Sequence, residues 1–339
     1  MTYSARLDGS AVEVEIGPEA LRAGSVEFSY PDMDDLIVDG WTLTMRGPDR
    51  ELKLEQLGRT RDDLLRELRA ARLPARRAAM LQSGAAKPID SFDAWRGDVP
   101  VLVGLHSDGI TVEPDLGTPD YIPLSCLIAV DRSGYDITLR ARAMEPVTVS
   151  KFGPRTDEFL QDLEEVRREL AKDTRDAYGA LDASLVSLSA SDGWAVTRAD
   201  AGPLWESLRG AFAGQARAEQ LAVLEQVSGE DLRLGIKTAF QGGTMPFALA
   251  LSGKRIAVES ADEEARATFV FETDDADYLN FVLLLTGFRR EALFLPEEKL
   301  GRWSVAVRML PAVRWARSAL AERVVHDSSW ETKLRSALA

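Results

Sequence analysis

Apolar and polar residues alternate at a period of two in several short segments of this chain. Val12, Val14 and Ile16 are separated by acidic residues, and Val147 and Val149 repeat the pattern further on. Successive side chains of a β-strand point to opposite faces, so this period is typical of strands buried on one face. The pattern predicts a chain rich in short strands separated by turns.

Two other segments have the period of a helix. One carries apolar residues spaced three or four positions apart, at Phe159, Leu163, Val166 and Leu170. The matching positions of the other are Leu64, Leu68, Ala71 and Ala75. Each pattern puts one apolar stripe on a helix of 3.6 residues per turn, and acidic residues in the first turn favour the helix dipole. Pro74 is expected to end or bend the first of these helices.

The two helix starts belong to a longer internal repeat. The sequence LGRTRDDLLREL at 57–68 aligns without a gap with FGPRTDEFLQDL at 152–163. Upstream, DGWTLTMR at 39–46 matches SGYDITLR at 133–140. The offset drifts only within turn-like segments, as expected for a duplicated domain whose loops have diverged. The sequence therefore predicts two copies of one unit, each a series of short strands closed by one helix.

Six or seven short strands followed by one C-terminal helix resemble the pleckstrin-homology-like (PH-like) fold, over about residues 3–172. The resemblance implies an α+β protein with tandem bent β-sandwich or barrel domains, each capped by its helix. Its expected domains are 1–82 and 90–178.

The rest of the chain predicts a mixed domain and a helical tail. ARATFVFE at 265–272 has a strand pattern, 202–227 has amphipathic helical spacing, and an acidic start at 273–288 precedes an apolar helix. Residues 180–290 are thus expected to form a diverged PH-like or other α+β domain with a helical insertion. Residues 291–339 are expected to be helical, with a break near 326–329.

Charge and composition restrict the partners. The net charge is −14, and counting side chains gives −3 for residues 1–82, −7 for 83–178 and −4 for 179–339. Nucleic acid is a poor partner because its binding depends on clustered basic residues, and the same charge disfavours an anionic membrane. A single cysteine and the lack of a long apolar run favour a cytoplasmic protein.

No set of residues forms a recognisable catalytic, cofactor or metal motif. His106 and His326 lack partners in sequence, and Cys126 lies in an apolar strand start, so all three are interpreted as structural. The carboxylates at 32–35 lack calcium-loop spacing, and the Gly-Lys pair at 251–255 lacks the glycine of a phosphate-binding loop.

Five arginines of the first closing helix, most of which fall on one arc of it, are the main candidate for an interaction surface. They are Arg66, Arg69, Arg72, Arg76 and Arg77. Two interpretations stay open: a solvated face, or a docking patch for an acidic partner or for the acidic second unit. Trp315 and Trp330 in the tail are further candidates for contact with a protein partner.

The sequence thus predicts a non-enzymatic scaffold that binds another protein or a second copy of itself, with Arg66, Arg69, Arg76, Trp315 and Trp330 as candidate interaction residues. One alternative is a peripheral membrane adaptor that recognises an anionic surface. Another is a subunit of an enzyme complex with a site within residues 193–300. Because a fold does not assign a function, these alternatives differ in the surface or pocket that each requires.

Overall fold

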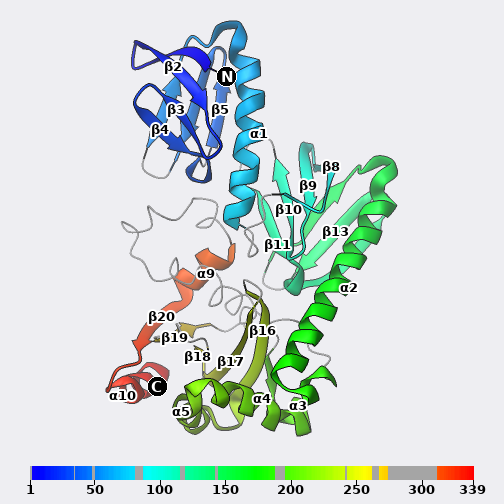
Figure 1. The fold of residues 1–339 in the computed structure, drawn as a ribbon, viewed down its shortest axis with the longest axis vertical. Coiled ribbons are helices and arrows are strands. Elements are labelled where there is room, and N and C mark those ends of the chain that lie inside the picture. The colour runs from blue at the N-terminus through cyan, green and yellow to red at the C-terminus, as the bar shows by residue number, and fades with distance from the viewer. Residues whose placement is uncertain are drawn as a thin grey trace.

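The strands and helices of the chain form three units along an elongated molecule (Figure 1). We call them the first unit (2–80), the second unit (90–181) and the third unit (195–339). The first and third units lie at opposite ends of the long axis. The computed structural model describes residues 2–33, 35–47, 50–80, 87–114, 119–141, 144–187, 195–240, 243–261, 267–273 and 311–339.

The first unit has two antiparallel sheets and one helix. The four-stranded sheet has the order β1-β2-β3-β4 and the three-stranded sheet the order β5-β6-β7. A bridge between Arg6 and Glu55 joins them, and helix α1 (Arg61–Met80) follows. The strands are β1 (Thr2–Leu7), β2 (Ser10–Ile16), β3 (Ala20–Ala23), β4 (Val26–Ser29), β5 (Asp35–Asp39), β6 (Thr42–Arg46) and β7 (Glu51–Leu54).

The second unit repeats this order of elements in one sheet. Its seven strands are arranged β11-β10-β9-β8-β14-β13-β12, because Ser150 on β14 pairs with Trp95 on β8. Helix α2 (Thr156–Leu181) follows. The strands are β8 (Asp90–Arg96), β9 (Val99–Leu105), β10 (Gly109–Pro114), β11 (Asp120–Pro123), β12 (Leu127–Ser133), β13 (Asp136–Ala141) and β14 (Val147–Ser150). The described strands of either unit form no closed barrel.

The predicted repeat appears as the same backbone path before each long helix. Gly58 and Gly153 have φ angles of 59° and 63°, and Gln56 and Lys151, two residues earlier, have 57° and 60°. Glycine adopts such left-handed angles without steric cost, which explains why both copies carry it there. The apolar stripes also behave as predicted, since Leu64 and Leu68 are buried in the first unit and Phe159 and Leu163 in the second.

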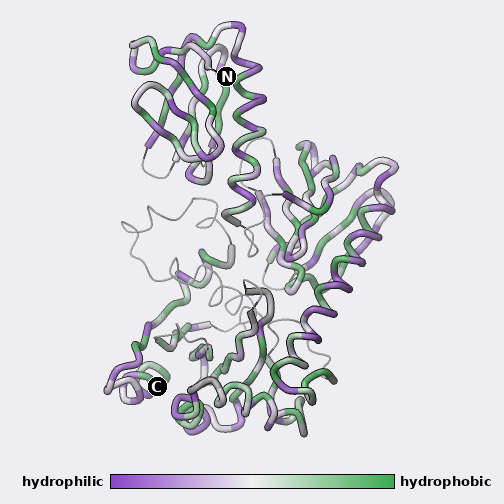
Figure 2. The backbone as a smooth tube through the Cα atoms, in the orientation of Figure 1, coloured by the Kyte–Doolittle hydropathy of each residue, from purple (hydrophilic) through white to green (hydrophobic). Residues whose placement is uncertain are grey.

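Each long helix extends beyond its own unit and reaches the next one (Figure 1). Of the two expectations for Pro74, that it ends or bends the helix, the first is wrong, because α1 runs through Pro74 to Met80. Its second half is held against the second unit, where Arg77 pairs with Glu113. Helix α2 ends against the third unit, where the hydroxyl of Tyr178 donates to the carbonyl of Ile236 at 3.2 Å. Figure 2 shows hydrophilic and hydrophobic positions alternating along α2.

The third unit has one six-stranded antiparallel sheet in the order β15-β16-β17-β18-β19-β20. This topology does not repeat the four-plus-three grouping of the first two units. The predicted helical insertion is present between β15 and β16. Its strands are β15 (Ala195–Thr197), β16 (Leu232–Phe240), β17 (Gly243–Ser252), β18 (Arg255–Ser260), β19 (Ala267–Glu272) and β20 (Leu320–Val325). Its helices are α3 (Arg198–Ala201), α4 (Trp205–Phe212), α5 (Ala218–Ser228), α9 (Pro311–Ala319) and α10 (Trp330–Leu338), with a π-helical turn at Ala213–Arg217.

The prediction of a wholly helical tail is wrong in one segment. Leu320–Val325 is strand β20, which pairs with β19 and completes the sheet. The pairing supplies hydrogen bonds to a strand edge that would otherwise be open, and this outweighs the local helical spacing. Helix α10 packs under the same sheet, with Leu334 and Leu338 in its core. The apolar helix predicted at 273–288 lies outside the described residues.

Candidate functional site

The arginines of α1 separate into an exposed and a buried group. Arg66 is exposed and pairs with Asp63 on the same helix. Arg72, Arg76 and Arg77 are buried toward the C-terminal end of the helix. The structure therefore places Arg66 apart from the buried arginines, although the sequence puts most of the five on one arc of the helix.

The buried arginines connect α1 to both neighbouring units. Arg72 donates from Nη2 to the backbone oxygen of Met33, 3.0 Å away, in the first unit. Arg77 donates from Nε to Oε1 of Glu113 on β10, and the side chains of this pair are only 6% and 2% exposed. The sequence left open whether these arginines form a solvated face or a docking patch. Arg77 docks against the acidic second unit.

Glu113 belongs to a chain of buried polar groups on β10 and the adjoining turn. The hydroxyl of Thr111 donates to Glu113 Oε1 at 2.6 Å. His106 Nε2 lies 3.3 Å from the same hydroxyl oxygen. Because the hydroxyl proton points to Glu113, Nε2 carries the proton of the imidazole and Nδ1 is an acceptor. The network therefore runs from Arg77 through Glu113 and Thr111 to His106.

Three buried polar atoms of this network are unsatisfied. Within the part of the chain that the structure describes, Oε2 of Glu113, Nη2 of Arg77 and Nδ1 of His106 have no hydrogen-bond partner. A buried donor or acceptor without a partner carries a desolvation cost of about 1–3 kcal/mol, so native proteins rarely leave several in one place.

Burial controls the charges of the network. It raises the pKa of Glu113, while the positive charge of Arg77 acts in the opposite direction. Burial, followed by repulsion from Arg77, lowers the pKa of His106 to about 4. His106 is therefore neutral near pH 7, in agreement with its role as a single donor to Thr111. A neutral histidine beside an ion pair fits the structural role that the sequence predicted for it.

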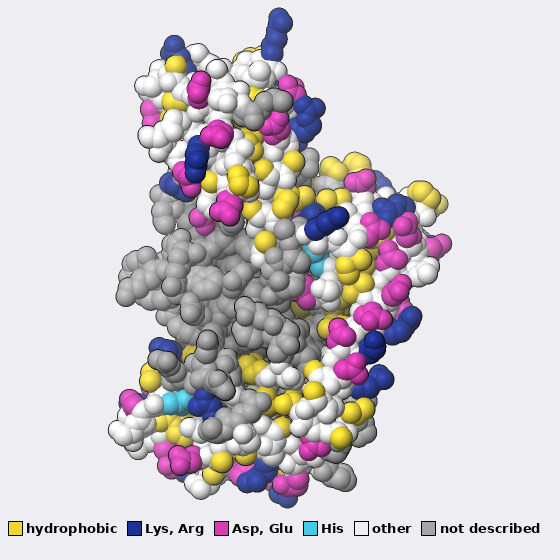
Figure 3. Space-filling view, viewed as in Figure 1, with side chains coloured by type: hydrophobic (Ala, Val, Ile, Leu, Met, Phe, Trp, Pro, Cys, Tyr) yellow, Lys and Arg dark blue, Asp and Glu magenta, His cyan; other side chains and the backbone are white. Residues whose placement is uncertain are grey.

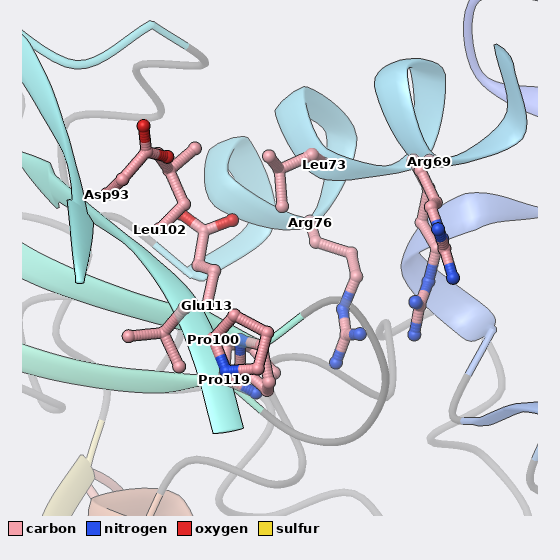
Figure 4. Close-up of a pocket in the computed structure, with 11 residues that line it drawn as sticks. Arg69, Leu73, Arg76, Asp93, Pro100, Leu102, Glu113 and Pro119 are labelled. Carbon is pink, nitrogen blue, oxygen red and sulfur yellow. The ribbon is translucent and has the colours of Figure 1, made fainter. Parts of the chain in front are cut away.

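A pocket of about 260 Å³ opens beside this network, between α1 and strands β9 and β10 (Figure 4). Arg69 and Arg76 extend into it from α1, and Glu113 reaches toward α1 from β10. Its lining residues are Arg69, Arg72, Leu73, Arg76, Asp93, Pro100, Val101, Leu102, Glu113, Pro114 and Pro119. The pocket thus combines guanidinium groups, carboxylates and an apolar wall at the joint between two units.

A second buried polar cluster holds α10 against the third sheet. His326 Nε2 lies 3.0 Å from Oε2 of Glu259, which is fully buried. Thr268 donates to the same carboxylate, and the indole Nε1 of Trp330 donates to Thr268 Oγ1 at 2.8 Å. Trp330 is 8% exposed. This tryptophan therefore serves the core of the third unit instead of the surface expected for a partner contact.

The remaining candidates have simpler placements. Trp315 is half-buried on α9 and stacks on Phe271 with ring centroids 6.1 Å apart. Cys126 is buried in the second unit, as predicted. Asp90, Glu158 and Asp162 bring carboxylate oxygens within 4.8 Å of one another, but Arg155 forms ion pairs with the first two. Arg155 therefore offsets part of the negative charge of this group at the start of α2.

The region of the predicted alternative enzyme site contains a broad hollow of about 930 Å³ beside α4 and α5. Four of its charged groups form two pairs: Arg209 binds Glu225 at 2.6 Å, and Arg198 lies 3.5 Å from Glu206. Glu230 and Asp231 also line the hollow.

Exposed aromatic rings occur at the same hairpin tip of the first two units. Trp41 follows Gly40 between β5 and β6 and is 59% exposed, and Tyr135 follows Gly134 between β12 and β13 and is 80% exposed. Both glycines have positive φ, 54° and 64°, as tight hairpin turns require. The sequence contains this signal in the match of DGW at 39–41 with SGY at 133–135.

In the second unit other side chains extend this tip into a patch. Asp136, next to Tyr135, pairs with Ser150, and Lys151 follows at the same end of the sheet. The ammonium group of Lys151 lies 4.4 Å from the ring centroid of Trp95. Trp95 is 36% and Val99 49% exposed. We call Trp95, Val99, Tyr135 and Lys151 the aromatic end of the second unit.

Charges of both signs are mixed over the visible face, and acidic side chains gather along α2 (Figure 3). Among the described residues, no helix is both long and apolar enough to cross a membrane. No protein-family model matches the chain, and no curated protein is similar to it in sequence. The function therefore has to be inferred from the surfaces and the pocket.

Proposed function

We propose that the first and second units are diverged PH-like domains and that the chain is a non-enzymatic cytoplasmic scaffold that binds another protein. Four strands, three strands and a closing helix occur in that order in both units, which supports the fold assignment. Helices α1 and α2 extend beyond their own units and pack on the next one. This supports the scaffold role, because a packed helix at each joint leaves little freedom for one unit to rotate against the next.

The observation that carries the binding function is the exposed aromatic ring repeated at equivalent tips, Trp41 and Tyr135. A single exposed aromatic residue needs no explanation. Two at the same position of diverged copies indicate a surface that both copies present. Aromatic rings supply large contact areas at a small entropic cost and are enriched at the centres of protein interfaces. The aromatic end of the second unit is the larger of the two surfaces.

Site-specific photo-crosslinking in the native cells tests this proposal. A benzophenone side chain replaces Tyr135 in one variant and the exposed Glu169 of α2 in a control variant. We expect a discrete protein adduct from position 135 that is absent from position 169. Adding Trp95→Ser to the first variant should reduce the adduct severalfold, because it removes a second ring of the same surface. Equal labelling from both positions would contradict the proposal.

Liposome flotation separates the membrane alternative from this one. Vesicles containing anionic lipid should leave the purified chain unbound at low salt, because the chain carries a net charge of −14. Co-flotation that salt reverses would instead support an electrostatic membrane adaptor.

A further inference from the structure

Among the described residues that line the pocket beside α1, positively charged side chains outnumber negatively charged ones by one. Arg69, Arg72 and Arg76 line it from the helix, whereas Asp93 and Glu113 line it from the second unit. A guanidinium group offers five N–H donors in a planar fork, so ligand oxygens can be added to the contacts that these side chains already make. Arginines in this arrangement favour carboxylate or phosphate groups, which they bind through paired hydrogen bonds.

The pocket also contains an unsatisfied hydrogen-bond acceptor, Oε2 of Glu113. Glu113 lines the pocket, its side chain is 2% exposed, and its Oε2 has no hydrogen-bond partner among the described residues. Its other oxygen is held by Arg77 and Thr111, so the carboxyl group cannot turn away without losing both bonds. An anion alone would place negative charge beside this oxygen. A ligand that also carries an ammonium group would donate a hydrogen bond to this oxygen.

The wall between these groups is apolar. It consists of Leu73, Pro100, Val101, Leu102, Pro114 and Pro119. A short hydrocarbon segment fits there, because proline rings and aliphatic side chains gain by excluding water. The volume of about 260 Å³ equals roughly nine water molecules at about 30 Å³ each. It lies just below the range of about 300–1,000 Å³ for drug-sized ligands, which indicates a smaller molecule.

We propose that the pocket between α1 and strands β9 and β10 binds an acidic α-amino acid. Its two carboxylates lie on the guanidinium groups of α1, and its ammonium group donates to Oε2 of Glu113. The short side chain lies along the proline-rich wall. The net charge of the ligand, −1, matches the excess of one positive charge among the described residues that line the pocket. This inference does not depend on the proposed scaffold function.

The position of the pocket gives binding a structural consequence. Arg72 ties α1 to the first unit, whereas Glu113 belongs to the second. A ligand that contacts both sides adds hydrogen bonds across the joint and stabilises one arrangement of the two units. Small-molecule sites occur preferentially at such domain interfaces.

Isothermal titration calorimetry on the full chain tests the ligand class without any substitution. The probes are L-glutamate, glutarate, which lacks the ammonium group, and inorganic phosphate. We expect L-glutamate to bind with one site per chain and at least about tenfold more tightly than glutarate, since one charged hydrogen bond is lost in the latter. Equal affinities for L-glutamate and glutarate, or no binding of L-glutamate, would overturn the proposal.

Matched substitutions on α1 locate the site. Arg76→Met removes a guanidinium group inside the pocket, and Arg66→Met removes one from the exposed side of the same helix. The first should weaken L-glutamate binding by about tenfold or more, and the second should leave it unchanged. Circular dichroism checks that both variants are folded. Binding that both substitutions weaken equally, or that neither changes, would contradict the location. Phosphate binding that depends on Arg76, without binding of L-glutamate, would show a plain anion site and overturn the proposal.

Discussion

The buried pair of Arg77 and Glu113 should respond differently to the loss of each partner. Glu113→Gln leaves a guanidinium group buried without a counter-charge, and arginine cannot release its proton to become neutral. Breaking a buried ion pair in this way costs about 3–5 kcal/mol. Arg77→Met leaves a carboxyl group that can take up a proton, so its cost should be smaller, about 1–3 kcal/mol.

The sign of the pH dependence follows from Glu113. Burial raises the pKa of Glu113 above the ordinary 4.5, and the positive charge of Arg77 limits this increase. Without Arg77 the pKa rises further, so the folded variant binds a proton over a pH range in which the unfolded chain does not. The free energy of unfolding of Arg77→Met should therefore be closest to that of the natural chain below pH 4.5 and should fall further behind it as the pH increases above that value.

Hydrogen exchange of the β9–β10 amides measures this locally, and urea unfolding followed by circular dichroism measures it globally. The double variant Arg77→Met with Glu113→Leu removes both charges and should recover most of the lost stability, because replacing a buried pair by apolar groups is often neutral. Equal costs for the two single variants, or a double variant as unstable as their sum, would refute this account of the pair.

Three further substitutions test other parts of the structure. The pKa of His106 is lowered to about 4, so between about pH 6.5 and 4 protonation favours the unfolded chain and the free energy of unfolding falls as the pH falls. His106→Gln should make the free energy of unfolding depend less on pH in this range. Urea midpoints at several pH values would show the difference, and an unchanged pH dependence would contradict it. Gly109→Ala should destabilise the second unit by about 1–3 kcal/mol, since its Cβ would overlap the ring of Tyr121, and an unchanged melting temperature would count against the packing. Trp330→Phe removes the donor to Thr268 and should cost about 1–3 kcal/mol in thermal unfolding; a smaller loss than that of Trp41→Phe at the exposed hairpin would argue against the buried network.

Local periodicity was a good guide to the elements that pack within their own neighbourhood. The stripe of Phe159, Leu163 and Val166 predicted α2 because a helix in contact with one core needs one apolar face. The glycines before α1 and α2 were informative for a similar reason, since a left-handed backbone angle limits the residue at that position.

Features that depend on distant segments were not predictable in the same way. The helical spacing of the tail gave no sign of β20, because its partner, β19, lies more than 40 residues earlier in the chain. Pro74 disfavours a helix locally, and only the docking of the next helical turns on the second unit explains why α1 continues.

The candidate site was predicted in part. The row of arginines identified the helix face, and the acidic charge of the second unit suggested where it could dock. Glu113 was missed, because it stands in a strand as one of many acidic residues and nothing nearby in sequence marks it as buried. Its pairing with Arg77 brings together two residues 36 positions apart.

The pairing of β20 with β19 sets an order for folding during synthesis. Strand β19 can pair with β18 as soon as both are made, but its other edge gains a partner only when β20 follows, and the ribosome adds about 5–20 residues per second. During those seconds β19 has an open edge to which a foreign strand could bind. A nascent chain halted before residue 320 should therefore be a target for chaperones, whereas the first two units already contain all the strands they need.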